Sequence, residues 1–443
     1  MSYEYNDFAT GFLTGIDKYV NRSYLNNDRV FVRKGKLSLA DTIKYPLIEG
    51  GHTNSREANK YIQLITGDDF ALISQQAIGE KRGFINPQVY VDMYKDFVDE
   101  FIRLFGDNQK YKDHIFLAGD TTVIKVPNVS KCKEEFPVQE GKPARARLST
   151  FADVFSGLVY TAELVEKNTS ESKLAVKHLH DINRRMPNQK IAAIYDRGYN
   201  VYDLIFNHLH FGIDFLIRLK DDFLEDEIAK LESDDEIIKL YLNKYITNTI
   251  EDDEIRKKYE KELSINLRVT KVKVKNKEGK TYTENLLSTL PMDKYSKEEL
   301  RTLYKYRWEV ETDYDRLKNV LELENFTGQR RIIIEQDVFS KIFLLNLCLT
   351  IKIDADKDIY EKRKDKNLKY EYQTNLNHLL GSLSQFLHKL MITDSEEERA
   401  KISNHLIVMA NQRLVLKHDK RDKDPKRHKG DITAKHKSND RRA

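Results

Sequence analysis

The chain has 443 residues, of which 40% are hydrophobic and 33% are charged, and its formal net charge is +4. This length permits several domains with a large buried core, and the composition is typical of a soluble globular protein. No run approaches the roughly 18 apolar residues of a membrane span, and the start of the chain does not resemble a signal peptide, so we expect neither. Two cysteines, Cys132 and Cys348, fit a reducing cytoplasm and argue against a structural zinc site.

The first 110 residues predict a helical domain. Apolar residues recur at helical spacing in the segments 55–65, 74–82 and 86–105. The short gap between the last two segments suits a helix-turn-helix unit, although helical pairs are common in globular domains. We interpret 1–110 as a DNA-binding domain, with Lys81 and Arg82 as candidate DNA contacts.

Beyond residue 110, short apolar runs alternate with helical segments, which predicts an α/β fold with a mixed sheet. The expected strands are 114–120, 156–165, 190–196 and 213–220, and the expected helices are 172–186 and 199–209. This pattern fills 111–222 and resumes over 286–350. Between them, 223–285 is acidic and irregular before a β-hairpin centred on 275–280, so we predict a β-rich insertion.

The remainder predicts helices followed by a tail. Residues 351–412 contain amphipathic helices that suit packing on the sheet or dimerisation. Residues 413–443 hold 12 Lys or Arg against 5 Asp and few apolar residues, which predicts a disordered basic tail. Nucleic acid is one partner for such a tail, and a solubilising terminus is the alternative.

Two acidic residues lie at the ends of predicted strands. Asp120 ends the strand 114–120 and Asp196 ends the strand 190–196. The carboxyl ends of strands are where open α/β sheets place ligand chemistry. Taken singly, either aspartate is more often a helix cap or a turn former.

A third carboxylate lies on a helix-prone stretch that carries Tyr304, Arg307, Glu311 and Lys318. On a regular helix these four side chains fall within an arc of about 60°. Glu309 is the rival for the acidic position, but it points about 160° away from Glu311. A solvated stripe with an i,i+4 ion pair is the alternative interpretation.

The oxygen-only set Asp120, Asp196 and Glu311 suits Mg²⁺ or Mn²⁺ rather than Zn²⁺. Two such ions about 4 Å apart activate a hydroxyl or water and stabilise the leaving oxygen of a phosphodiester. Arg307 and Lys318 would then bind the flanking phosphates. Tyr304 has three open roles: touching a phosphate, stacking on a base, or packing.

The spacing of these residues resembles a known family. Tyr304, Arg307, Glu311 and Lys318 match the Y-R-E-K signature of bacterial insertion-sequence transposases of the DDE type, the insertion-sequence-four-like family. The motifs YDRGY around Asp196 and GDTT around Asp120 are similar to that family's two aspartate motifs. The resemblance covers roughly residues 30 to 410.

The resemblance implies an RNase H-like fold and two Mg²⁺ ions, with Mn²⁺ substituting. It implies cutting at terminal inverted repeats, strand transfer into target DNA, and a synaptic homodimer in the bacterial cytoplasm, at the nucleoid. Arg197, beside Asp196, joins the expected DNA contacts. Relatives form a hairpin intermediate with an aromatic residue of the insertion. The only tryptophan, Trp308, lies outside the insertion, so Tyr241, Tyr245 or Tyr259 would have to serve.

Two other functions stay open at this point. One is an RNase H-like nuclease that hydrolyses DNA without joining ends. The other is a decayed relative that only binds DNA, which the presence of all three acids disfavours.

Overall fold

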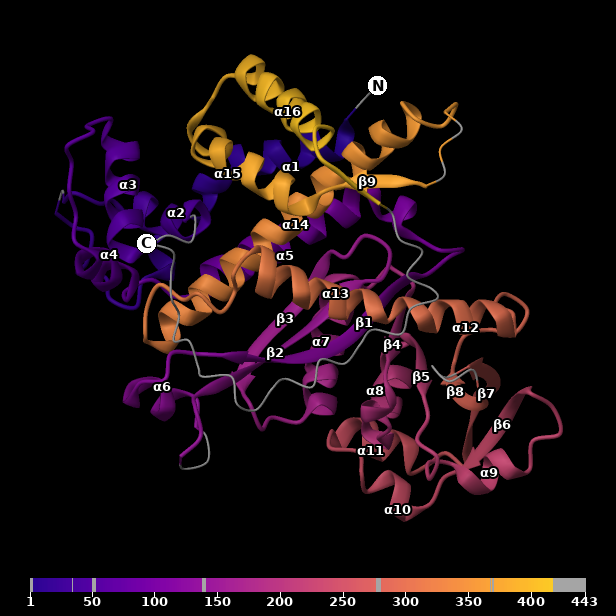
Figure 1. Cartoon of the computed structure of the whole chain (residues 1–443). Helices are drawn as coiled ribbons and strands as arrows, with labels where there is room; N and C mark the ends of the chain where they lie inside the picture. Colours follow the sequence, from indigo (N-terminus) through magenta and orange to yellow (C-terminus); the bar gives the residue numbers. More distant parts are fainter. Residues whose placement is uncertain are drawn as a thin grey trace.

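The computed structural model describes residues 3–33, 35–49, 53–137, 141–275, 280–366, 368 and 370–416, without the side chains of 275, 309, 312, 313 and 320. Its centre is a mixed sheet with the strand order β3-β2-β1-β4-β5-β8-β7-β6 (Figure 1). In chain order the strands are β1 Ile115–Lys125, β2 Arg145–Asp153, β3 Val159–Glu166, β4 Ile191–Tyr195, β5 Asp214–Arg218, β6 Asp235–Tyr241, β7 Ser264–Lys275 and β8 Thr281–Ser288.

Strands β1 to β5 form the RNase H-like part of the sheet. β1 runs antiparallel to β2 and parallel to β4, and β4 runs parallel to β5. Helices α7 (Glu171–Arg185) and α8 (Tyr202–Phe211) follow β3 and β4, and the short α6 (Ser130–Glu135) precedes β2. The predicted α/β fold is confirmed. The strand β2 was not predicted, because Arg145 and Arg147 interrupt its apolar pattern.

The predicted hairpin forms, but as part of the main sheet. β7 and β8 pair antiparallel, and β8 also pairs with β5 through Ile217↔Leu287. The acidic stretch before the hairpin, expected to be irregular, contains β6 and the short helices α9 Glu225–Ala229, α10 Lys244–Thr247 and α11 Asp253–Tyr259. Leu286 and Leu287 are fully buried, so the hairpin is held by packing as well as by its strand ladder.

The amino-terminal helices divide into two groups. They are α1 Glu4–Thr14, α2 Leu39–Ile48, α3 Asn54–Thr66, α4 Gln75–Arg82 and α5 Gln88–Phe105. Helices α1 and α5 pack against α14 (Arg331–Glu361) in the main core. Helices α2 to α4 gather around a small second core and lie to one side in Figure 1. The segment 1–110, expected as one domain, is therefore not a single packed unit.

Helix α5, the second helix of the predicted helix-turn-helix unit, packs into the main core through one face. This apolar face, which includes Tyr90, Met93 and Phe97, is buried. The opposite side of the helix carries exposed residues such as Asp96 and Arg103. The helix-turn-helix interpretation stays a prediction.

The carboxyl-terminal part is helical, as expected. α14 is followed by β9 Tyr372–Thr374, α15 Leu376–Ile392, α16 Glu396–Ala410 and β10 Leu414–Leu416. β10 pairs with β9, so the segment expected as a tail from 413 begins with a short strand, and 417–443 lies outside the described residues. Within the described chain, no helix combines the length and apolarity needed to cross a membrane.

Candidate active site

Asp120 and Asp196 occupy matching positions on neighbouring strands. β1 and β4 pair in parallel as far as Ala118↔Ile194, an offset of 76 residues, and the same offset relates Asp120 to Asp196. Asp196 follows β4 directly, as predicted, and keeps an extended backbone, with φ −81° and ψ 179°. Asp120 was predicted to end a strand, but it lies inside β1, which continues to Lys125 because β2 pairs with it that far. Because aligned residues of adjacent strands face one side of a sheet, the two carboxylates lie on the same surface.

Backbone amides hold both carboxylates. The N–H of Thr121 donates to Asp120 Oδ1 at 2.7 Å. The N–H of Gly198 donates to Asp196 Oδ1, also at 2.7 Å, in a short 3-10 turn that Asp196 caps. Each aspartate is therefore oriented by a main-chain donor within two residues, as a preorganised site requires.

Glu311 reaches the site through Arg307. α12 (Lys297–Tyr306) ends just before Arg307, and α13 (Trp308–Asp315) begins just after it. Arg307 Nη2 lies 3.2 Å from Glu311 Oε1, and its Nη1 lies 3.8 Å from Asp120 Oδ2. The guanidinium, which is 4.6 Å from the centre of the Trp308 ring, thus stands between carboxylates from two distant parts of the chain.

The charges of the site perturb each other. Burial, the largest cause, together with the carboxylates of Glu311 and Asp196 raises the pKa of Asp120 to about 7, against the lowering effect of Arg307 and of the Thr121 amide. Burial lowers the pKa of Arg307, but Tyr304 and the nearby carboxylates outweigh it, so the pKa stays above its ordinary value. A buried carboxyl with a raised pKa beside other acids is typical of a functional site.

Tyr314 fixes α13 to the central strands. Its hydroxyl donates to the carbonyl oxygen of Asp120 at 2.5 Å and accepts bonds from the Thr150 amide and hydroxyl at 3.1 and 3.0 Å. The helix that carries Glu311 is therefore tied to the same peptide that carries Asp120.

Lys318 lies in an irregular turn that follows α13. Residues Arg316–Val320 form a π-helical turn, with Leu321 N–H bonded to the carbonyl of Arg316 at 3.1 Å. Lys318 Nζ donates to Thr122 Oγ1 at 2.6 Å and to the Val123 carbonyl at 3.2 Å, and burial lowers its pKa. The structure thus attaches Lys318 to β1, two residues beyond Asp120. The regular arc expected from the sequence does not extend to it.

Tyr304 is 9% exposed and packs in the core. Burial raises its pKa to about 12 against the lowering effect of Arg307 and Arg218. Of the three roles left open by the sequence, packing is the one that this burial supports.

Two predicted DNA contacts do not lie at the site. Arg82 is 1% exposed and pairs with Asp337 at 2.6 Å, and its Nε donates to Gln336 Oε1 at 2.9 Å. Arg82 therefore holds α4 to α14, and we remove it from the proposed DNA contacts. Lys81 is half-buried, with its Nζ 4.9 Å from the centre of the Phe31 ring.

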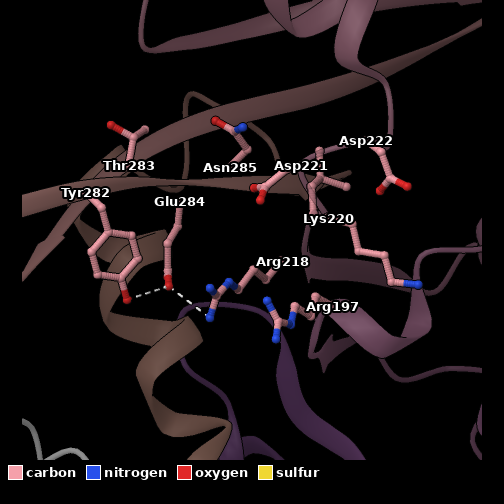
Figure 2. Close-up of a pocket in the computed structure, with 10 residues that line it drawn as sticks. Arg197, Arg218, Lys220, Asp221, Asp222, Tyr282, Thr283, Glu284 and Asn285 are labelled. Atoms are coloured by element: carbon pink, nitrogen blue, oxygen red, sulfur yellow. Dashed lines mark hydrogen bonds and ion pairs between the residues drawn. The ribbon is translucent and has the colours of Figure 1, made fainter. Parts of the chain in front are cut away.

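Arg197 borders a cleft that the sequence did not indicate. The cleft has a volume of about 610 Å³ and lies where β5 ends beside β8 (Figure 2). Arg197 and Arg218 enter it from one side, and Arg218 Nη1 pairs with Glu284 Oε1 at 2.9 Å. Lys220 also lines the cleft. The basic residues of the segment 218–220 were the available signal, but only the pairing of β5 with β8 brings them next to Arg197.

Glu171 and Arg147 were also missed. Both contact Thr121, the residue after Asp120. Glu171 opens α7 and resembles an ordinary acidic residue of a first helical turn, so the sequence carried no sign of its position. The side chain of Glu309, the rival considered for the third acid, lies outside the described residues.

The residues fit a divalent cation in donor chemistry. Asp120, Asp196 and Glu311 offer only oxygen ligands. The pKa of Asp120 is raised mainly by burial and also by Glu311 and Asp196, and a bound cation would favour its charged form. As they stand, no three Asp, Glu, His or Cys side chains of the described residues converge closely enough to form a metal-binding group. Glu311 instead bonds to Arg307.

Residues 111–347 match the family described as "Transposase DDE domain". This is more than half of the 443 residues, and it contains the three acids considered above. The chain belongs to the DDE transposase family. No curated protein matches its sequence.

Solved transposase structures are also similar, at low identity. A piggyBac transposase synaptic complex with hairpin DNA shares 10% identity with a TM-score of 0.41, covering 90% of this chain and 84% of that one. A Mos1 transposase paired-end complex with the left transposon end shares 13% with a TM-score of 0.18, covering 45% and 64%. A Mos1 mariner paired-end complex with Mn shares 14% with a TM-score of 0.18, covering 67% and 86%. The family assignment rests on the domain match, because TM-scores this low carry no argument.

Proposed function

We propose that this transposase cuts at the terminal inverted repeats of an insertion sequence and joins the ends to target DNA. The observation that carries the proposal is the placement of Asp120 and Asp196 in matching register, with Arg307, between α12 and α13, lying between Asp120 and Glu311 of α13. The Y-R-E-K spacing further favours an insertion-sequence-four-like member acting at the bacterial nucleoid, with two subunits pairing the ends.

Asp120, Asp196 and Glu311 would hold two Mg²⁺ ions, with Mn²⁺ substituting, and these supply an activated hydroxyl and stabilise the leaving oxygen. In this proposal Arg307 binds a phosphate beside the scissile bond, since its guanidinium already faces the acids. Lys318, which bonds to Thr122 of β1, and Arg197, in the turn after Asp196, are placed beside the same surface in this proposal. Tyr304 supports Arg307 by packing.

The cleft beside Arg197 is not basic overall. Asp221, Asp222 and Glu284 line it together with Arg197, Arg218 and Lys220, and Glu284 pairs with Arg218, so we assign it no DNA contact beyond Arg197. For a hairpin step, Tyr259 is a poor stacking residue because it is buried and packs on Phe206. Tyr241 and Tyr245 are 68% and 79% exposed and remain the candidates.

The test uses labelled terminal repeats, a target plasmid and Mg²⁺. We expect cleaved ends and joined product from the wild type. Glu311→Gln should reduce cleavage at least about 10³-fold, since it removes a group needed in the transition state, while end binding stays within about twofold. Glu309→Gln is the matched control and should retain cleavage. Cleavage without joined product would favour the nuclease alternative, and full cleavage by Glu311→Gln would refute the assignment of the acids.

A further inference from the structure

The carboxylate of Glu171 lies beside the residues that hold the two aspartates. Its Oε1 accepts a hydrogen bond from Thr121 Oγ1 at 2.8 Å. Helix α7, which Glu171 opens, packs against the turn that holds Gly198, and Glu171 Oε2 lies 3.5 Å from the position that a Cβ would occupy on that glycine. Thr121 and Gly198 are the two residues whose backbone N–H groups hold Asp120 and Asp196. Glu171 therefore bonds to one support of the aspartate pair and lies beside the other.

Arg147 holds Glu171 in this position. From β2, its Nη1 bonds to Glu171 Oε1 and donates to Thr121 Oγ1 at 2.8 Å, and its Nε donates to the Lys167 carbonyl at 2.9 Å. The Thr121 hydroxyl thus accepts from Arg147 and donates to Glu171. The three side chains bond to one another pairwise, and each of these bonds includes a charged group, either Arg147 or Glu171. The Arg147 side chain is 16% exposed and the Glu171 side chain is 38% exposed, so the pair is only partly shielded from water.

The turn after Asp196 is tight around the carboxylate of Asp196 itself. A Cβ on Gly198 would lie 2.9 Å from Asp196 Oδ1, closer than a Cβ tolerates, whereas its 3.5 Å distance from Glu171 Oε2 would be an ordinary van der Waals contact. The glycine therefore lets its N–H bond to Asp196 Oδ1, and Glu171 packs beside the same turn. A change at Glu171 thus reaches the turn through packing.

We propose that Glu171 is a positioning residue for strand cleavage, setting the carboxylates of Asp120 and Asp196 through Thr121 and Gly198. It acts through these neighbours and contacts neither the DNA nor the reacting atoms. The inference rests on the proposed function, since it assigns the support of the same site. Groups that orient metal-binding carboxylates typically change metal affinity or activity by about 10–100-fold when they are altered.

The experiment compares Glu171→Gln, Thr121→Val and Thr121→Ser in the full chain. Thr121→Val removes the hydroxyl with little change in shape, and Thr121→Ser restores it. Glu251→Gln is the matched control. Glu251 forms an exposed ion pair, at 2.7 Å, with Lys173 of α7, the helix that Glu171 opens. Cleavage of terminal repeats is measured against Mg²⁺ concentration. A DNA-free Mg²⁺ titration follows the fluorescence of Trp308, the only tryptophan, whose ring lies 4.6 Å from Arg307 Cζ.

Glu171→Gln and Thr121→Val should raise the Mg²⁺ concentration for half-maximal response by about 10–100-fold in both assays. Metal-free end binding and the melting temperature should stay near wild type, and Thr121→Ser and Glu251→Gln should behave as wild type. An unchanged Mg²⁺ response in Glu171→Gln overturns the inference, as does a Thr121→Ser that fails like Thr121→Val. Asp120→Asn separates the two proposals. If Asp120→Asn keeps the Mg²⁺ response, the acids themselves are wrongly assigned. If Asp120→Asn loses the Mg²⁺ response while Glu171→Gln keeps it, only the role of Glu171 is refuted.

Discussion

The side chains of Arg82 and Asp337 form an ion pair inside the protein, with 2.6 Å between Nη2 and Oδ1 and 1% of each side chain exposed. This pair joins α4, at the end of the small amino-terminal core, to α14. Arg82→Met should lower the free energy of unfolding by about 3–5 kcal/mol, because it leaves the Asp337 carboxylate buried without its cation. Chemical denaturation measures this loss.

Lys81→Met is the neighbouring control and should change the free energy of unfolding by less than about 1 kcal/mol, since the Lys81 ammonium makes only a cation–π contact with Phe31. If Arg82→Met unfolded like the wild type but bound DNA ends with a shallower salt dependence, Arg82 would be a phosphate contact after all.

Gly119→Ala should disturb the site without touching a charged group. A Cβ at this position would lie 2.5 Å from Phe151 Cε1 and 2.7 Å from Tyr195 Cε1, both in the buried core. Overpacking of this kind costs about 1–3 kcal/mol, and the shift would fall on Asp120, the next residue. The melting temperature and the rate of end cleavage should both decline. Adding Phe151→Leu should recover part of each, and the absence of any recovery would contradict the steric explanation.

Asp120→Asn should change how stability depends on pH in metal-free protein. Folding raises the pKa of Asp120 from 3.8 to about 7, mainly by burial. A group with a raised pKa contributes stability that is fully present below about pH 3.8 and is lost as the pH rises through about 7. The melting temperature of Asp120→Asn should therefore exceed that of the wild type at pH 8, with the difference vanishing near pH 4. Parallel melting curves across this range, in the presence of EDTA, would contradict it.

Removing residues 417–443 should weaken DNA binding in a salt-dependent way. The segment from 413 onward holds 12 Lys or Arg against 5 Asp. Each phosphate that a protein neutralises adds about 0.9 to the magnitude of the slope of log binding constant against log salt concentration. Truncation after Leu416 should therefore reduce that slope by about this amount for every phosphate that the tail neutralises. Titrations of duplex DNA at several salt concentrations measure the slope. An unchanged slope would assign the tail to solubility alone.

The parts of the site that depend on local geometry could be predicted from the sequence. The i,i+4 spacing of Arg307 and Glu311 needs only a helix, and the structure brings these side chains within 3.2 Å. The position of Asp196 after an apolar run likewise indicated the end of β4. Asp120 shares its side of the sheet, although its strand continues to Lys125. Both inferences used distances along the chain that regular secondary structure converts directly into distances in space.

The parts that depend on long-range packing could not be predicted. Arg82 looked like a free basic residue until Asp337, far along the chain, was found to neutralise it. The π-helical turn at Lys318 follows from how the chain leaves α13, which no spacing rule anticipates. Glu171 has the sequence appearance of any acid at a helix start, and only the packing of α7 against β1 and β2 brings it beside Arg147 and Thr121.

The strand ladder that joins β8 to β5 determines which parts of this chain can be exchanged. The stretch between β5 and β7 can be lengthened at the exposed residues 232–233 without breaking a bond to β5. Removing β6 would uncover the backbone N–H and C=O groups along β7, and removing β7 and β8 would uncover those along β5, in each case an exposed edge prone to aggregation. Chimaeras that graft a different loop onto this transposase should therefore insert it at 232–233 and keep both β6 and the hairpin that follows.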